Sequence, residues 1–359
     1  MKRIINVAVR SSICNFRCSY CYLNQKKVWF KNEQINYRYS PEIVKKAFSI
    51  ERLGGPCWFN ICADGETLLA KDILEYTKVI LENGHYVEFV SNMTVTKVLQ
   101  DFCKMNGELL KRVEFKCSFH YAELKQRGLL NVFADNVNLV RKSGCSICVE
   151  MIPDDNMIPF IEEIKDFSIE HFGALPQLSI PRNDKKRHDL LSKLSMPEFV
   201  RTWRQFDSPF FDFKLLIFKK KIRSFCHAGR TALYVDLATG HTQQCYNDSG
   251  YSFNIFENID SPIPFCSICK CNDYYCYNGH LFLTTGCTNL YSEYHYGDIR
   301  DRQTIDNKSW ISNDVLRFMN EKSYDCYTKD SDMADKKIMR KKRINHFWKA
   351  IRKRLTNEK

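Results

Sequence analysis

The chain has 359 residues, of which 44% are hydrophobic and 13% aromatic, so it is long enough to bury a sizeable core. It has no run of about 18 or more apolar residues, and we therefore expect no membrane-spanning helix. The net charge is +12, but residues 335–359 alone carry a net +9, so the body is nearly neutral and the basic character belongs to the tail.

Seventeen cysteines would suit a disulfide scaffold in a secreted protein, but the first apolar stretch, residues 5–9, is too short for a secretory signal. We therefore expect a cytoplasmic protein, in which clustered cysteines more often bind metal. Cysteines outside the clusters lie in apolar or strand-like segments, and we expect them to be small buried residues. These are Cys57, Cys62, Cys103, Cys117, Cys145 and Cys148.

Strand-like apolar runs alternate with helix-like segments over the first half of the chain. The predicted strands are residues 3–9, 57–62, 86–91, 113–119, 146–152 and 175–180. The predicted helices include residues 42–53, 68–83, 96–105 and 157–172, and glycine follows several of them, where it can end a helix. This alternation predicts an α/β fold with a parallel sheet covered by helices, in the form of a partial (β/α)6 barrel. Ligands of such folds bind at the carboxyl ends of the strands.

The alternation stops near residue 220, where cysteine, glycine and tyrosine become more frequent. We therefore predict a barrel domain over residues 1–220, a cysteine-rich domain over 221–334 and a basic C-terminal helix over 335–359.

Cys14, Cys18 and Cys21 have the spacing C-x3-C-x2-C and directly follow the first predicted strand, at the ligand-binding end of the barrel. Three thiolates bound to a [4Fe–4S] cluster leave one iron open to an outside ligand. Zinc would normally need a fourth protein ligand at close spacing, and the next cysteine is Cys57. The spacing therefore favours an iron–sulfur cluster over zinc.

This stretch resembles the signature of the radical S-adenosylmethionine (SAM) superfamily, including the aromatic Tyr20 before the third cysteine. The resemblance implies that the three cysteines hold a [4Fe–4S] cluster and that its open iron is chelated by the amino and carboxylate groups of SAM. An electron, from a donor such as flavodoxin or ferredoxin, would then cleave SAM to methionine and a 5′-deoxyadenosyl radical, which abstracts a substrate hydrogen.

The loop after the second predicted strand extends the resemblance. Residues 64–67, Asp-Gly-Glu-Thr, are similar to the superfamily's Gly-Gly-Glu-Pro loop, which contacts the SAM amino group. By this resemblance Gly65 would permit close backbone approach, and Glu66 would accept a hydrogen bond from the SAM ammonium.

Polar residues also end the next predicted strands. Residues 91–93, Ser-Asn-Met, resemble a Thr-Asn-Gly turn near the site, and Ser118 stands where the family often has a serine near the SAM carboxylate or ribose. Each of these residues alone would more often be a strand-end cap, but their recurrence at successive strands favours a binding site. The predicted SAM-binding residues are Tyr20, Gly65, Glu66, Asn92 and Ser118, with Glu150 as a further inward polar candidate.

Residues 226–287 contain seven cysteines and resemble the SPASM extension of radical SAM enzymes, which binds up to two auxiliary [4Fe–4S] clusters. The resemblance implies that Cys266, Cys269, Cys276 and Cys287 complete one cluster, and that Cys226 and Cys245 hold the other, with Cys271 or His280 as further ligands. The spacing departs from the SPASM pattern in its second half, where Cys271 is extra and His280 replaces a cysteine. The number of auxiliary clusters, one or two, therefore stays undecided, and zinc is the alternative metal at this site.

The resemblance covers roughly residues 5–290 and implies hydrogen-atom abstraction followed by oxidation, epimerisation or bond formation. A peptide side chain and a sugar or small metabolite are the two candidate substrate classes. The alternative function is non-enzymatic: a cysteine-rich zinc or electron-transfer protein that binds an acidic partner through its tail.

Residues 336–355 place five apolar side chains on one helical face and Lys or Arg on the others, which predicts a basic amphipathic helix. The apolar residues are Ile344, Phe347, Trp348, Ile351 and Leu355. Such a helix can dock on the protein's own body, lie at an anionic membrane surface as a peripheral anchor, or bind nucleic acid or an acidic partner. Nucleic acid is the least favoured of these partners.

Overall fold

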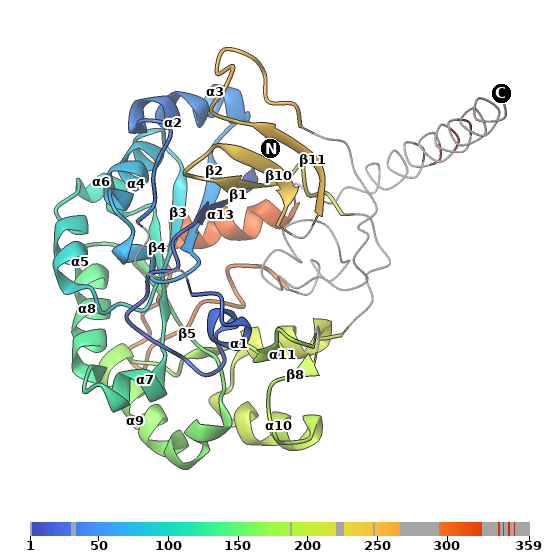
Figure 1. Cartoon of the computed structure of the whole chain (residues 1–359). Coiled ribbons are helices and arrows are strands. Elements are labelled where there is room, and N and C mark those ends of the chain that lie inside the picture. The colour runs from blue at the N-terminus through green and yellow to red at the C-terminus, as the bar shows by residue number, and fades with distance from the viewer. Residues whose placement is uncertain are drawn as a thin grey trace.

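The computed structural model describes residues 2–29, 34–186, 189–219, 226–246, 248–265 and 294–324, with positions 337, 340, 344 and 348. Six strands pair in parallel and in chain order, as predicted. They are β1 (Arg3–Val9), β2 (Cys57–Ala63), β3 (Tyr86–Ser91), β4 (Val113–Ser118), β5 (Ser146–Met151) and β6 (Gln177–Leu178). Their curved sheet forms the partial barrel of an α/β fold (Figure 1).

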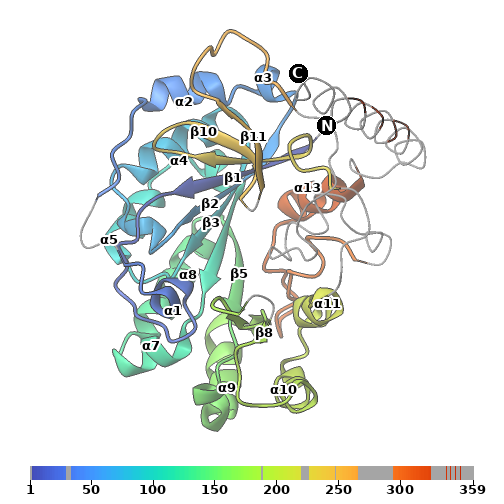
Figure 2. The ribbon, with the colours of Figure 1, turned by 45° about the vertical axis from the view of Figure 1, so that its right-hand side comes forward.

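Helices cover the outer face of this sheet (Figures 1 and 2). They are α2 (Pro41–Ala47), α3 (Ile50–Leu53), α4 (Ile73–Glu82), α5 (Thr96–Phe102), α6 (Gly107–Leu110), α7 (Tyr121–Gln126), α8 (Leu130–Lys142) and α9 (Ile161–Phe172). The glycines expected to end helices, Gly54, Gly84, Gly144 and Gly173, all have positive φ. Their left-handed backbone confirms these helix ends.

All four predicted helices given above are shorter in the structure, and the segment 96–105 ends as α5 at Phe102. The segment 42–53 divides into α2 and α3, because Ser49 caps a new helix by accepting from the backbone N–H of Arg52 at 3.3 Å. The segment 68–83 begins with a 3-10 turn, η1 (Thr67–Leu69), before α4. The segment 157–172 likewise begins within η2 (Asp155–Phe160), which contains Pro159 and therefore lacks one backbone donor.

Two helices that the sequence analysis did not predict follow β6. A short hairpin of β7 (Arg182–Asn183) and β8 (Asp189–Leu190) leads into α10 (Met196–Trp203), the 3-10 turn η3 (Arg204–Phe206) and α11 (Pro209–Ile217). A capping box between Ser195 and Glu198 begins α10. That box was the sequence signal that could have located this helix.

Residues beyond 226 extend the same sheet along the free edge of β1. Strand β9 (Ala232–Asp236) pairs with β1 in parallel, and β10 (His241–Cys245) and β11 (Asp248–Asn254) continue antiparallel. The sequence analysis predicted no strands here. The division into a barrel domain and a cysteine-rich domain therefore remains a prediction, with these strands hydrogen-bonded to the barrel.

The segment 294–324 returns to the barrel and ends in α13 (Asn313–Tyr324), which lies on the other side of the sheet from α2–α9 (Figures 1 and 2). The ring of Phe318 on α13 stacks on Tyr86 with ring centroids 4.1 Å apart, and on Trp58 at 6.4 Å. Trp310, just before α13, donates its indole N–H to the carbonyl of Phe172 at 2.9 Å. Through these contacts, α13 and the segment that precedes it pack against the barrel near the amino ends of the strands.

Most cysteines outside the two clusters are buried as predicted: Cys57, Cys117, Cys145 and Cys148. Cys62 and Cys103 are partly exposed. Within the described parts of the chain, no helix has both the length and the apolar character that spanning a bilayer requires. In the tail, positions 337, 340, 344 and 348 are helical, and Ile344 and Trp348 are 49% and 55% exposed.

Candidate functional site

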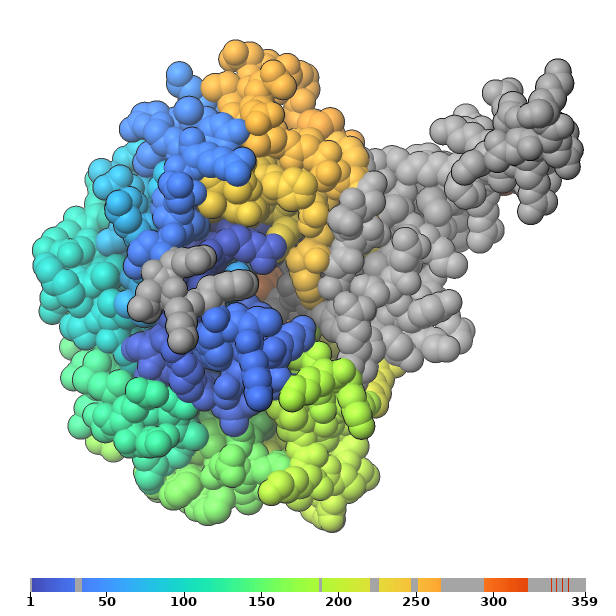
Figure 3. All heavy atoms as spheres, viewed as in Figure 1, coloured from blue at the N-terminus to red at the C-terminus, as the bar shows by residue number. Residues whose placement is uncertain are grey.

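The three clustered cysteines lie in the segment between β1 and α1 (Tyr22–Lys26), residues 10–21, which we call the cysteine loop. The loop follows β1 at the carboxyl ends of the parallel strands, and the dark blue spheres of the first part of the chain face the viewer in Figure 3. One cavity, the cluster cavity, is lined by the three cysteines and by four of the five predicted SAM-binding residues: Cys14, Cys18, Cys21, Gly65, Glu66, Asn92 and Ser118. The structure therefore brings these sequence-predicted residues together.

Gly65 lets the loop after β2 pack directly on the cysteine loop. Its N–H donates to the carbonyl of Ser11 at 2.7 Å, and the N–H of Glu66 donates to the carbonyl of Ile13 at 2.8 Å. A Cβ at position 65 would lie 2.2 Å from the carbonyl oxygen of Ile13. The predicted close backbone approach is thus present, but it is to the cysteine loop itself.

Glu66 is 3% exposed and accepts three hydrogen bonds from the chain. The donors are the N–H of Leu68 at 3.0 Å, the hydroxyl of Ser91 at 2.7 Å and the N–H of Asn92 at 2.7 Å. Burial raises the pKa of Glu66, and these hydrogen bonds oppose that rise. Because its Oε2 accepts from Asn92 alone, this oxygen has acceptor capacity left for a ligand ammonium.

Asn92 holds the cysteine loop from the end of β3. Its side-chain amide donates to Oδ1 of Asn15 at 2.8 Å, and its own Oδ1 accepts from the hydroxyl of Thr94 at 2.6 Å. Asn15 closes the ring by donating to the same hydroxyl at 2.8 Å. Met93 follows with φ of 57°, so it takes the left-handed conformation that glycine would adopt in the related turn.

Burial raises the pKa of all three thiols, and that of Cys14 to about 11. They are therefore protonated thiols at neutral pH, and a bound cation would displace the protons. No three His, Cys, Asp or Glu side chains of the described residues converge around a single ion. A cluster attaches each thiolate to a different iron, so its ligands stand farther apart than those of one zinc ion. Three soft thiols on one cavity fit such a group.

Tyr20, which is buried, and His120, which is partly exposed, form a pair beside the cysteines. The Tyr20 hydroxyl lies 2.7 Å from Nδ1 of His120, and burial lowers the pKa of His120 to about 4, so the imidazole is neutral at neutral pH. The sequence analysis missed His120. The sequence could have marked His120 as a site residue, because it stands two residues beyond Ser118 at the same strand end.

A second cavity of about 410 Å³, the large cavity, adjoins the cluster cavity. Tyr20 lines the large cavity, and Cys21 and His120 line both cavities. Its volume falls within the range of about 300–1,000 Å³ that is typical of small-molecule sites. Together the two cavities offer room for a cofactor and for a further reactant beside it.

Lys116 and Glu150 line the large cavity from β4 and β5. Nζ of Lys116 lies 2.9 Å from Oε2 of Glu150, and the side chains are 13% and 8% exposed. Burial alone would lower the pKa of Lys116, but Glu150 and Glu88 raise it above its ordinary value, so the ammonium stays charged. Glu150 was a candidate from the sequence, whereas Lys116 was not.

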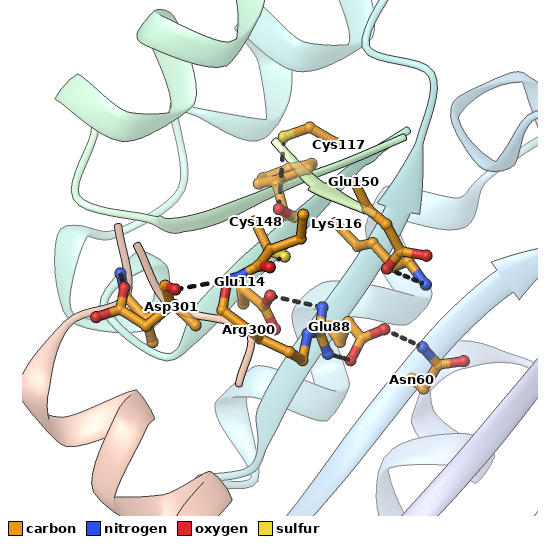
Figure 4. A network of polar contacts seen from close by, with 12 residues as sticks. Asn60, Glu88, Glu114, Lys116, Cys117, Cys148, Glu150, Arg300 and Asp301 are labelled. Carbon is orange, nitrogen blue, oxygen red and sulfur yellow. Dashed lines mark hydrogen bonds and ion pairs between the residues drawn. The ribbon is translucent and has the colours of Figure 1, made fainter. Parts of the chain in front are cut away.

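Beneath this pair, Arg300 reaches the barrel interior from the segment before α13 (Figure 4). Its guanidinium contacts Glu88 at 2.5 Å and Glu114 at 2.7 Å, and all three side chains are at most 2% exposed. Burial raises the pKa of Glu114 to about 8, whereas Arg300 lowers that of Glu88 in spite of its burial. One cation thus holds one buried carboxylate charged and leaves the other easily protonated.

The predicted auxiliary-cluster residues are only partly described. Cys226 is 8% exposed in a small apolar cluster with Phe210, Phe213 and Ile217, and Cys245 packs against that cluster. The structure therefore brings Cys226 and Cys245 to one place. The remaining predicted ligands, Cys266, Cys269, Cys271, Cys276, Cys287 and His280, lie outside the described residues.

Residues 9–156 match the family described as the Radical SAM superfamily. This range contains all three clustered cysteines and all five predicted SAM-binding residues. No curated protein matches the chain.

Solved structures with similar folds include Streptococcus suis SuiB bound to S-adenosylmethionine, at a TM-score of 0.51 and 13% identity. The match covers 71% of this chain and 64% of that chain, so the chain spans less than two thirds of SuiB. A second is anSMEcpe with bound AdoMet, at a TM-score of 0.49, 15% identity and coverage of 73% and 76%. A third is BtrN in complex with AdoMet and 2-DOIA, at 0.39, 17% identity and coverage of 72% and 80%. The likeness to SuiB shows a shared fold.

Proposed function

We propose that the protein is a radical SAM enzyme that reductively cleaves SAM at a [4Fe–4S] cluster bound by Cys14, Cys18 and Cys21. The observation that carries the proposal is the cluster cavity, on which the three thiols face the loops after β2, β3 and β4. The match of residues 9–156 to the Radical SAM superfamily supports the same chemistry. The large cavity, which adjoins the cluster cavity at Cys21 and His120, would hold the substrate.

The cluster and SAM, when bound, supply a carbon-centred radical that removes a hydrogen atom from the substrate. The chain's own residues bind and orient. Gly65 and Asn92 hold the cysteine loop from two strands, and Glu66 presents a buried carboxylate oxygen to the SAM ammonium. Phe16, with 1% of its surface exposed, and Leu23, with 2%, line the same cavity and exclude water from it.

The substrate is either a peptide side chain or a sugar or small metabolite, since either fits a cavity of about 410 Å³. One or two auxiliary clusters would assist oxidation or bond formation. The packing of Cys226 and Cys245 on one apolar cluster supports an auxiliary site there. A flavodoxin or ferredoxin would supply the electron.

Anaerobic purification and reconstitution of the full chain test this proposal. We expect a brown protein that binds iron and sulfide and, when reduced, converts SAM to 5′-deoxyadenosine and methionine. Replacing Cys14, Cys18 and Cys21 with Ala should abolish the conversion. Cys103→Ala is the matched control, because Cys103 lies at the end of α5 and lines neither cavity.

A colourless protein with stoichiometric zinc would instead support the non-enzymatic alternative. Retained SAM cleavage in the triple cysteine variant would contradict the assignment of the cluster ligands.

A further inference from the structure

We propose that Gln25 couples the two cavities. It fastens the hairpin of β7 and β8, which forms one wall of the large cavity, to the cysteine loop, so that SAM bound at the cluster holds the hairpin in place. The inference rests on the proposed function, because it takes SAM to bind beside the cysteine loop. Gln25 is a positioning residue, since it lines neither cavity and acts through the backbone of its neighbours.

The hairpin is a folded unit at the edge of the large cavity. Its two strands pair antiparallel, and Oδ1 of Asn183 accepts from the backbone N–H of Lys185 at 3.1 Å and of Lys186 at 3.0 Å. Arg182 and Asp184 line the large cavity. The position of the hairpin therefore sets the shape of this cavity on one side.

The side-chain amide of Gln25 bonds to the cysteine loop and to the hairpin at once. Its Nε2 donates to the carbonyl of Tyr20 at 2.8 Å and to the carbonyl of Arg182 at 3.0 Å. Its Oε1 accepts from the backbone N–H of Asp184 at 3.0 Å. Helix α1, which carries Gln25, and the hairpin lie side by side in both ribbon views (Figures 1 and 2). One side chain thus joins the residue before Cys21 to the end of β7.

The three bonds require a carboxamide at position 25. A primary amide has two N–H donors and one carbonyl oxygen, and here both donors reach carbonyl oxygens while the oxygen meets an N–H. A carboxylate has no proton to donate, so Gln25→Glu would keep one bond of the three and set a negative charge against two carbonyls. All three partners are backbone groups, so the bonds depend on where the hairpin lies and not on its side chains.

The shared contacts of Gln25 imply a coupling between the two cavities. SAM bound beside the cysteine loop favours the ordered form of that loop, and it thereby favours the contacts that the ordered loop makes with the hairpin. Such a coupling is reciprocal for binding free energies. A substrate that holds the hairpin in place would therefore strengthen SAM binding at the cluster.

Limited trypsin digestion of the full-length reconstituted protein tests the coupling. Lys185 and Lys186 are exposed on the hairpin, and mass spectrometry measures cleavage after them. The digestion is anaerobic, with and without SAM, and without reductant, so SAM stays intact. The cleavage rate follows the population of the detached hairpin as long as detachment is fast relative to cleavage.

We expect SAM to slow this cleavage in the wild-type protein by at least about fivefold, the lower end of typical couplings between sites. In Gln25→Met and in Gln25→Glu, cleavage without SAM should be faster than in wild type, because the hairpin has lost its bonds to the cysteine loop. SAM should no longer slow it. Glutamate is nearly the same size as glutamine, so its failure to restore the effect would assign the coupling to the hydrogen bonds and not to packing.

Two control variants separate this coupling from simple loosening. Gln205→Met makes the same replacement at an exposed glutamine that donates to the carbonyl of Thr202 at 2.7 Å, and it should behave as wild type. Asn183→Ala removes bonds within the hairpin and leaves Gln25 in place. It should raise the cleavage rate but keep the slowing by SAM.

Equal slowing by SAM in wild type and in Gln25→Met would overturn the coupling. So would a wild-type cleavage rate that SAM leaves unchanged although SAM alters the electron paramagnetic resonance spectrum of the cluster. Failure of the proposed function looks different: the wild-type protein then binds no iron, or its cluster spectrum does not change when SAM is added, and the coupling falls with it.

Discussion

Two buried polar regions lie inside the same barrel and are built differently. At the carboxyl ends of the strands, the cysteine loop and the loops after β2, β3 and β4 surround cavities. Nearer the amino ends, Arg300 fills the interior and pairs with Glu88 and Glu114. The first region leaves space and acceptor capacity for ligands, whereas the second pairs its charges within the chain. We call the first the open region, because it surrounds cavities, and the second the closed region, because its charged side chains pair with one another.

The largest effect is expected at the closed region. Arg300→Met leaves Glu88 and Glu114 buried without their cation, and we expect the free energy of unfolding to fall by about 3–5 kcal/mol. Urea denaturation of the protein measures this loss. Arg317→Met is the control, because Arg317 forms a surface pair with Asp314 at 3.2 Å, and its loss should cost less than about 1 kcal/mol. Equal losses in both variants would show that the Arg300 pairs do not stabilise the barrel.

The same region should make stability depend on pH through Glu114, which faces Arg300, Glu88, Lys116 and Glu150. Its pKa is raised from 4.5 to about 8, so between these values the folded state holds a proton that the unfolded chain releases. Glu114 therefore makes its full contribution to the free energy of unfolding below pH 4.5, and that free energy falls as the pH rises toward 8. Urea denaturation at both ends of this window should show a flatter dependence in Glu114→Gln. An unchanged slope would contradict the assignment.

The open region should respond to Gly65→Ala. The added Cβ would meet the carbonyl oxygen of Ile13 at 2.2 Å, so either the cysteine loop or the loop after β2 must move. We expect a loss of about 1–3 kcal/mol in the free energy of unfolding and a larger fractional loss of iron binding. Gly107→Ala is the matched control, since no atom lies within 4 Å of its added Cβ. Iron content per chain after reconstitution measures the effect, and equal iron in both variants would contradict it.

The two regions also differ in how far the sequence predicts them. The cysteine spacing and the polar strand ends are local patterns, and they identified seven of the residues that line the cluster cavity. His120 and Lys116 were missed, because each gains its role only when β4 is placed beside the cysteine loop or β5. Arg300 could not be predicted, since 186 residues separate it from Glu114 and no local pattern marks such a pair.

The fold shows the same limit. Strands β1 to β5 were predicted to within one or two residues, because their apolar runs are long and buried. Strand β10 was missed because its buried side chains, Thr242 and Gln244, are polar and carry no hydrophobic alternation. Helix α10 was missed although the sequence marks it with a capping box and with two aromatics at i, i+4 spacing, Phe199 and Trp203, both of which are buried.

The smallest effect on the site is expected from the tail, since none of its described residues lines either cavity. Its helical positions include exposed Lys337 and Arg340, and Ile344 and Trp348 are about half exposed, at 49% and 55%. Each Lys or Arg near an anionic surface adds about 1 kcal/mol of attraction. We therefore expect the full chain to float with phosphatidylserine vesicles at low salt more than a chain lacking residues 335–359, and neither to float with neutral vesicles. SAM cleavage should be the same in both chains, because neither cavity is lined by a tail residue that the structure describes. Equal flotation would remove the membrane interpretation and leave docking on the body or an acidic partner.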